Sequence, residues 1–92
     1  MKANQDVMRD FVNGVESRSR NVYSDGNNLY NYGTLIAEKI GGHKVLFNVT
    51  KYSVATSKIQ SQLRSILVRG GWEIEEVCNV PLRPWGLTYY RK

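Results

Sequence analysis

Two glycine-containing turn signals, Asp25-Gly26 and Gly41-Gly42, divide the middle of this sequence and constrain its fold more than any other feature. Around them lie three runs rich in tyrosine, leucine and β-branched residues, at 18–24, 29–39 and 44–51. Glycine supplies the positive φ of tight hairpin turns, and aromatic and β-branched side chains suit a half-buried pleated surface. The pattern predicts a three-stranded antiparallel meander. Neither side of run 29–39 is cleanly apolar, so we expect both sheet faces to be partly covered.

Two amphipathic helices are expected to flank the meander. Residues 4–12 form the first, capped by Asn4 and ended by Gly14, and residues 56–69 form the second, ended by Gly70-Gly71. Apolar residues recur at helical spacing in both segments. In the first they are Met8, Phe11, Val12 and Val15, and in the second Ile59, Leu63, Ile66 and Leu67. The second stripe is broad enough to cover a sheet.

Two further strands, 72–78 and 87–91, are expected after the second helix. The loop 80–86 between them contains Pro81 and Pro84, which cannot donate backbone hydrogen bonds, and Trp85. The expected architecture is therefore a single α+β domain over residues 1–92. Its order is helix, three strands, helix and two strands, with an antiparallel sheet covered by the second helix.

Charge and composition limit the class of protein. The net charge of +5, from thirteen basic and eight acidic residues, favours a polyanionic partner or a protein face that handles one, although solubility alone also explains it. No apolar run approaches the ~20 residues of a membrane span, and the start lacks the apolar core of a signal peptide. The single cysteine cannot form an internal disulfide. We therefore expect a cytoplasmic protein with no membrane partner.

Catalytic and metal-binding patterns are weak in this sequence. His43 is the only histidine and falls in a predicted turn, and Cys78 is interpreted as a small buried hydrophobic residue. A structural zinc site normally needs four Cys or His ligands. A site that combines one of these two residues with Asp25 or Glu38 stays open as an alternative. We expect no catalytic residue, no metal and no cofactor.

One acidic segment leaves an enzymatic alternative open. Glu73, Glu75 and Glu76 place two carboxylates on one face of a predicted strand and one on the other. Such carboxylates could hold a divalent ion in a nuclease, but the usual accompanying lysine motif is absent. We interpret the segment as a solvated strand and expect the protein not to be an enzyme.

Aromatic and basic residues interleave on the first predicted hairpin. They are Arg18, Arg20, Tyr23, Tyr30 and Tyr32. Proteins that bind single-stranded nucleic acid stack bases on strand aromatics and place cations beside the backbone. The alternative is that these tyrosines only pack the sheet, because tyrosine favours strands for structural reasons.

A second candidate surface is the polar side of the helix predicted over 56–69. It carries Lys58, Gln62, Ser65 and Arg69, with Arg64 beside them, and the helix contains no acidic residue. A merely solvated helix usually mixes charges of both signs. The pattern therefore predicts contact with negative charge, either phosphate or an acidic protein face.

A set of motifs resembles a family of small proteins encoded by bacteriophages and mobile elements. The motifs are Asp25-Gly26, Leu29-Tyr30-x-Tyr32-Gly33-x-x-Ile36-Ala37, Asn48, and Tyr52-Ser53-x-x-Thr56-Ser57-Lys58-x-Gln60, within residues 20–67. The family has no established chemistry. By genre, the resemblance implies an anti-CRISPR-type inhibitor in the bacterial host cell, binding a defence effector such as a Cas nuclease. Because this chain is basic, it would bind a protein surface of the effector and not imitate DNA. The alternative function is a small basic accessory protein that binds DNA or RNA through the tyrosine hairpin and the helix face.

Overall fold

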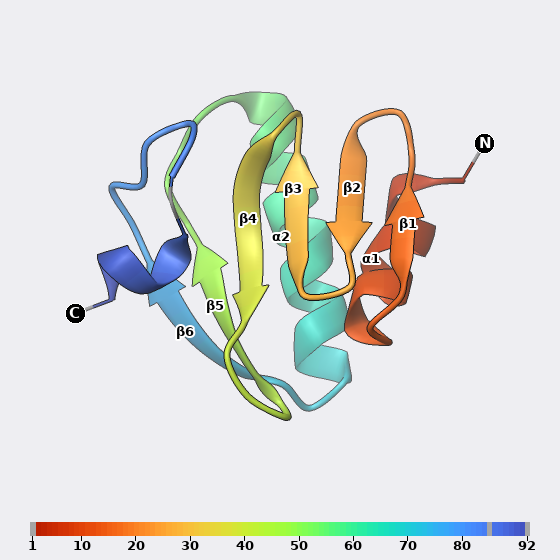
Figure 1. Cartoon of the computed structure of the whole chain (residues 1–92). Helices are drawn as coiled ribbons and strands as arrows, with labels where there is room; N and C mark the ends of the chain where they lie inside the picture. Colours follow the sequence, from red (N-terminus) through yellow and green to blue (C-terminus); the bar gives the residue numbers. More distant parts are fainter. Residues whose placement is uncertain (1, 85, 92) are drawn as a thin grey trace.

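The computed structural model describes residues 2–84 and 86–91, so Trp85 of the predicted loop lies outside the described residues. It contains two α-helices, six strands and one short 3-10 helix (Figure 1). In chain order they are α1 (Asn4–Val12), β1 (Glu16–Arg18), β2 (Val22–Asp25), β3 (Asn28–Asn31), β4 (Thr34–Lys39), β5 (Lys44–Asn48), α2 (Val54–Arg69), β6 (Glu73–Val77) and the 3-10 helix η1 (Leu87–Tyr90). The predicted α+β class and both helices are confirmed. No helix in the described ranges is long and apolar enough to cross a membrane.

The six strands form one mixed sheet in the order β1-β2-β3-β4-β5-β6. Strands β1 to β5 are an antiparallel meander, whereas β6 pairs with β5 in parallel. The expectation of a purely antiparallel sheet was wrong here because α2 carries the chain back to the end where β5 began. A helical crossover of this kind joins parallel neighbours.

Two of the predicted strands are in fact hairpins. Run 18–24 turns at residues 19–21, where the backbone N–H of Val22 donates to the Ser19 hydroxyl at 3.2 Å. Run 29–39 turns at Tyr32-Gly33 and is divided there into β3 and β4. Ser19 and Asn21 in the first turn and Gly33 in the second are residue types that favour turns, but the β-branched and aromatic residues around them favour strand, and the prediction continued each strand through the turn.

The predicted strand 87–91 was wrong: residues Leu87–Tyr90 form η1. The segment lies across one face of the sheet instead of pairing at its edge. There Leu87 is fully buried and its backbone N–H donates to the Glu38 carboxylate at 2.8 Å. The Arg91 guanidinium holds the end of the segment by two hydrogen bonds to Glu75, at 2.7 and 2.9 Å.

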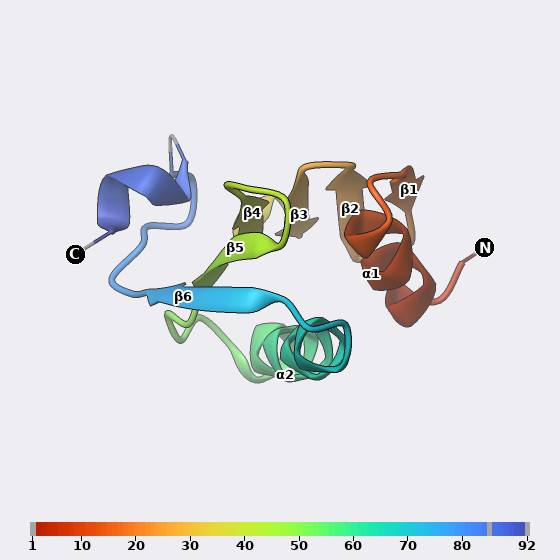
Figure 2. The ribbon, with the colours of Figure 1, turned by 90° about the horizontal axis from the view of Figure 1, so that it is seen from below.

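Both faces of the sheet are partly covered, as predicted. Helices α1 and α2 pack on one face over a core that includes Phe11, Leu29, Phe47 and Leu63. The C-terminal segment packs on the other face over a smaller core of Leu35, Leu46, Val77, Val80 and Leu87. Figure 2 shows this segment beside β5 and β6, while β1, β2 and β3 carry no other described element on that side. The sheet therefore has an open face over its first three strands.

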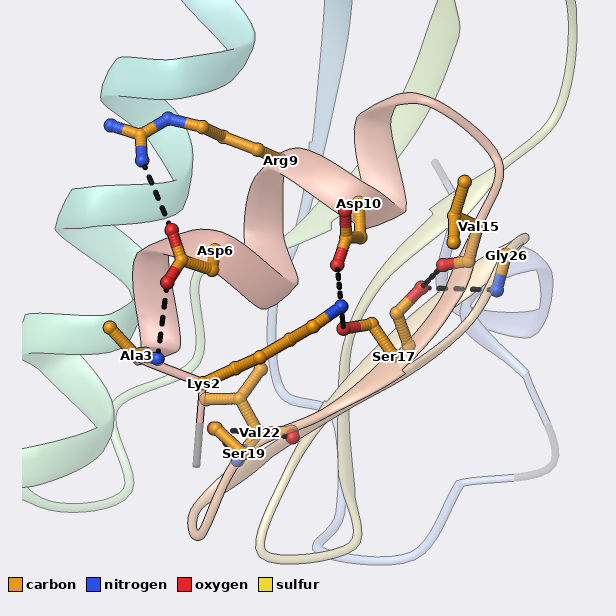
Figure 3. A network of polar contacts seen from close by, with 11 residues as sticks. Lys2, Ala3, Asp6, Arg9, Asp10, Val15, Ser17, Ser19, Val22 and Gly26 are labelled. Carbon is orange, nitrogen blue, oxygen red and sulfur yellow. Dashed lines mark hydrogen bonds and ion pairs between the residues drawn. The ribbon is translucent and has the colours of Figure 1, made fainter.

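Helix α1 is held at both ends against the strands. Ala3 is its N-cap residue rather than Asn4, whose side chain instead accepts a hydrogen bond from the Ser19 hydroxyl at 2.6 Å. Near its start, Lys2 bridges Asp10 at 2.7 Å and Ser17 at 3.1 Å on the β1 side of the helix (Figure 3). These contacts fix the first hairpin relative to the helix layer.

Lys39 of β4 secures the other end of α1. Its ammonium group donates to the carbonyls of Phe11 and of Gly26, the latter at 3.0 Å. Cations are favoured at helix C-termini. Partial burial lowers the pKa of Lys39 from its usual value. The contact ties α1, the β2–β3 turn and β4 together, so the strands that carry the open face are well fixed.

Candidate functional site

A row of three side chains crosses the open face of the sheet. Arg18 lies opposite Tyr23 in the β1–β2 register, and Tyr23 lies opposite Tyr30 in the β2–β3 register. Side chains on alternate strand positions point to opposite faces. The neighbours of Tyr23, Val22 and Ser24, are buried on the helix side. The row therefore lies on the open face, where Arg18 is exposed, Tyr23 is half-buried, and Tyr30 is half-buried beside the smaller core.

The row is ordered by contacts between its own members. The rings of Tyr23 and Tyr30 stack with centroids 6.0 Å apart and an interplanar angle of 26°. The Arg18 guanidinium lies 5.1 Å from the centroid of the Tyr23 ring, within cation–π range. The Tyr23 hydroxyl donates to Glu16 at 2.8 Å. The result is a shallow aromatic platform flanked by a cation.

Both platform phenols have a raised pKa. The hydrogen bond to Glu16 raises the pKa of Tyr23 above its usual value. Burial raises the pKa of Tyr30, and the charges of Asp25 and Glu38 act in the same direction. A phenol already titrates near pH 10 in water. Both rings are therefore neutral at physiological pH, and neither hydroxyl would repel a phosphate.

Tyr32 stands at the end of the platform in an unusual backbone conformation. It is the first residue of the two-residue β3–β4 turn and has φ +52°, followed by Gly33 at φ +82°. This turn normally takes Asn-Gly, Asp-Gly or Gly-Gly, and positive φ is rare for a bulky residue. Its side chain is 68% exposed. A strained backbone that presents an exposed aromatic ring points to a functional role.

The five predicted hairpin residues lie around one shallow hollow. Its lining includes all of Arg18, Arg20, Tyr23, Tyr30 and Tyr32, and its volume is about 220 Å³. Arg20 and Asn21 come from the β1–β2 turn, and Tyr32 comes from the β3–β4 turn next to it. The hydrogen bond from the Tyr32 N–H to the Asn21 carbonyl, at 3.0 Å, joins the two turns. The sequence placed these residues on one hairpin, and the fold brings them together from two.

The predicted α2 residues divide between two sides of the helix. Lys58 and Gln62 line a hollow that they share with Tyr32, so they adjoin the tyrosine platform. Arg69 lines the next hollow along α2, together with Gln62. Arg64 turns toward β6, where its guanidinium pairs with Glu76. The helix has no acid of its own, but β6 supplies one that offsets Arg64.

Two residues near this surface were not identified from the sequence. Asn21 lines both the platform hollow and the hollow beside Lys58. Arg9 lines the groove between α1 and α2 together with Arg69. Figure 3 shows Arg9 on the side of α1 that faces α2, away from the Lys2–Asp10 pair. A helical wheel places Arg9 with Gln5, at i and i+4, opposite the buried stripe, and that signal could have identified it.

The other predicted chemical groups have structural partners or stand apart. His43 stacks on Trp72, with ring centroids 4.6 Å apart. Cys78 is exposed, not buried as expected, because β6 ends one residue earlier at Val77. The three glutamates of β6 form ion pairs with Lys44, Arg64 and Arg91. No group of three or more Cys, His, Asp or Glu residues in the described chain could hold a metal ion.

Several motif residues behind the phage-protein resemblance have structural roles. The Asp25 carboxylate accepts from the backbone N–H groups of Asn27 and Asn28 at 2.8 and 2.7 Å and closes the β2–β3 turn. The buried Asn48 amide donates to the Leu35 carbonyl and the Tyr52 hydroxyl, at 3.0 and 2.9 Å. These contacts stabilise the hairpins and the β5–α2 connection.

Comparisons of the chain with protein-family models, curated proteins and solved structures find no match. The resemblance to small phage-encoded proteins therefore stays a prediction.

Proposed function

We propose that this protein binds single-stranded nucleic acid through its open sheet face, without catalysing a reaction. The observation that carries the proposal is the ordered row of Arg18, Tyr23 and Tyr30 on the uncovered strands, with Tyr32 exposed at its end. Unpaired bases expose their π-faces, and stacking on a protein aromatic contributes about 1–3 kcal/mol per base. Arg18 and Arg20 supply positive charge for the phosphates beside those bases.

The shape of this surface favours single strands over duplexes. Sequence-specific reading of a duplex usually needs a helix or ribbon that enters a groove, whereas stacking needs bases that are already unpaired. The platform is a shallow hollow on a sheet. The shallow hollow and its tyrosine rings fit a flexible single strand whose bases stack on the rings.

Fluorescence anisotropy with a labelled strand of about 12 nucleotides and with its duplex tests this proposal. We expect the single strand to bind more tightly. Two to four phosphate contacts predict a log–log salt slope between about −1.4 and −2.8, at roughly 0.7 per contact. Arg18→Gln/Arg20→Gln should weaken binding and flatten the slope.

The matched control is Lys51→Gln/Arg83→Gln, which has the same net charge as Arg18→Gln/Arg20→Gln. Both residues are exposed, and neither lines the platform hollow or the two hollows next to it. This control should bind like the wild type. Absence of binding at low salt, or equal losses in the two double variants, would refute the proposal.

A second candidate function uses the same surface against a protein. Tyrosine and arginine dominate the binding energy of protein interfaces, and this face combines three tyrosines with two arginines around one hollow. The partner would be a host defence effector that targets nucleic acid, such as a Cas nuclease, as the phage-protein resemblance implies. The test is whether this protein inhibits target cleavage by the purified effector. Inhibition that is lost in Tyr32→Ala, and that persists when this protein has been treated with nuclease before the assay, would favour this candidate.

A further inference from the structure

The platform surface continues past the end of the sheet and onto the helix layer. Three shallow hollows follow one another. The first lies on the open sheet face, the second between the β-turns and α2, and the third between α1 and α2. The first and second share Asn21 and Tyr32, and the second and third share Gln62. Together they form one bent track, which we call the corner track.

The corner track is positively charged. Its basic lining residues are Arg9, Arg18, Arg20, Lys58 and Arg69. In the described chain no acidic residue is among those that line the three hollows, but Glu16 lies beside the platform and accepts a hydrogen bond from the Tyr23 hydroxyl at 2.8 Å. Arg9 has one acidic neighbour, Asp6, at 3.6 Å, but both are exposed and such a pair contributes little in water. Each of the three hollows therefore has at least one basic side chain in its lining.

Elsewhere on the molecule, several basic residues are already paired. Lys44, Arg64 and Arg91 all meet glutamates of β6 at 3.5 Å or less. The contrast matters because a solvated surface normally mixes charges. The glutamates of β6 thus neutralise basic residues away from the track. The basic residues of the track give it a charge complementary to a polyanion.

Hydrogen bonds fix the corner where the track passes from sheet to helices. The Thr56 hydroxyl of α2 donates to the Asn31 side-chain oxygen at 2.9 Å. The Asn31 amide group donates in turn to the Asn21 carbonyl at 3.0 Å. These contacts hold the Tyr32 turn beside the start of α2. The two halves of the track are therefore fixed relative to each other before any ligand binds.

We propose that one continuous nucleic-acid strand follows the corner track. Its bases stack on the tyrosine platform, it bends past Tyr32, and its phosphates continue along α2 to Lys58 and Arg69. This inference rests on the proposed function and deepens it by defining the path and length of the ligand. The platform row covers two strand spacings, about 10 Å. From Lys58 to Arg69 the helix rises about 16 Å. At about 3.4 Å per nucleotide for stacked bases, a strand of about 3 nucleotides would fill only the platform, whereas one of about 8 or more would span both parts.

The test combines strand length with variants in the helix part of the track. Affinity for strands of about 3 and about 12 nucleotides is measured for wild type, Lys58→Gln/Arg69→Gln and the equal-charge control Lys51→Gln/Arg83→Gln. We expect the track variant to bind the short strand normally. It should bind the long strand at least about fivefold more weakly, with a salt slope smaller by about 1.4 for two lost contacts. The control should match the wild type at both lengths.

Each outcome has a separate meaning. If the long strand binds the wild type and the track variant equally, the strand ends at the platform and this inference is wrong, while the proposed function stands. If neither strand binds the wild type at low salt, the proposed function itself fails. If the track variant and the control weaken long-strand binding equally, the strand is held only by the overall positive charge of the protein and not by the track. If Lys58→Gln/Arg69→Gln weakens binding to the protein effector but leaves the affinity for both strands unchanged, the track binds protein and the nucleic-acid path is refuted.

Discussion

Replacement of Leu63 by alanine is expected to lower the free energy of unfolding by about 2–5 kcal/mol. Leu63 lies on the inner face of α2, is fully buried and packs into the core between both helices and the sheet. Alanine would remove buried apolar contacts and leave a cavity that the surrounding side chains cannot fully close. Thermal and urea unfolding measure the change.

Val68→Ala provides the control on the same helix. Val68 is 61% exposed, and alanine is the better helix former, so its stability should change by less than about 0.5 kcal/mol. Equal stability of Leu63→Ala and wild type would place this face of α2 outside the core. The helix layer, and with it the corner between sheet and α2, would then be wrong.

Tyr32→Asn is expected to have opposite effects on stability and binding. Tyr32 has φ +52°, a conformation that asparagine adopts more readily at the first position of this turn. The substitution should therefore raise the free energy of unfolding by about 1 kcal/mol. It also removes a ring that is 68% exposed beside the platform. Losing one stacked base would weaken single-strand binding about 5- to 150-fold.

Tyr89→Asn is the matched control, because Tyr89 is 75% exposed on η1 and outside the platform hollow. It should leave affinity unchanged. If Tyr32→Asn binds the single strand as tightly as wild type, the Tyr32 ring does not contact the bound strand. Lower stability in Tyr32→Asn would show that tyrosine suits the turn, and the argument from backbone strain would fail.

The helices could be predicted from sequence because their signals are local. The apolar spacing around Leu63 identifies the buried face of α2, and the hydroxyl of its N-cap residue, Ser53, accepts from the Thr56 N–H at 3.2 Å. The two hidden turns could not be predicted in the same way. In one, a serine hydroxyl replaces a backbone partner, and in the other, tyrosine accepts a positive φ. Ser19, Asn21 and Gly33 favour turns, but the β-branched and aromatic residues on either side favour strand and outweighed them in the prediction.

The residue types of the candidate site could be predicted from the sequence, but their arrangement in space could not. Interleaved tyrosines and arginines identified the hairpin surface, but only the strand register aligns Arg18, Tyr23 and Tyr30 in one row. Ion pairs between residues far apart in the sequence also decide which basic side chains of α2 remain available to a ligand. Arg64 and Arg69 look alike in sequence, yet only Arg64 meets Glu76 of β6. The C-terminal segment forms η1 and not a strand, and the Glu38 carboxylate of β4 holds it by accepting from the Leu87 N–H. No local sequence pattern predicts this contact.

The most direct test is to titrate the isotope-labelled protein with a short single-stranded oligonucleotide and follow its backbone amide signals by NMR. We predict that the largest shifts fall on residues 18–23 and 30–33, around the tyrosine platform, and that β6 and η1 are unaffected. Saturable shifts there would place unpaired bases on the open sheet face. Shifts centred on β6 or η1, or no shifts at low salt, would contradict binding at this surface.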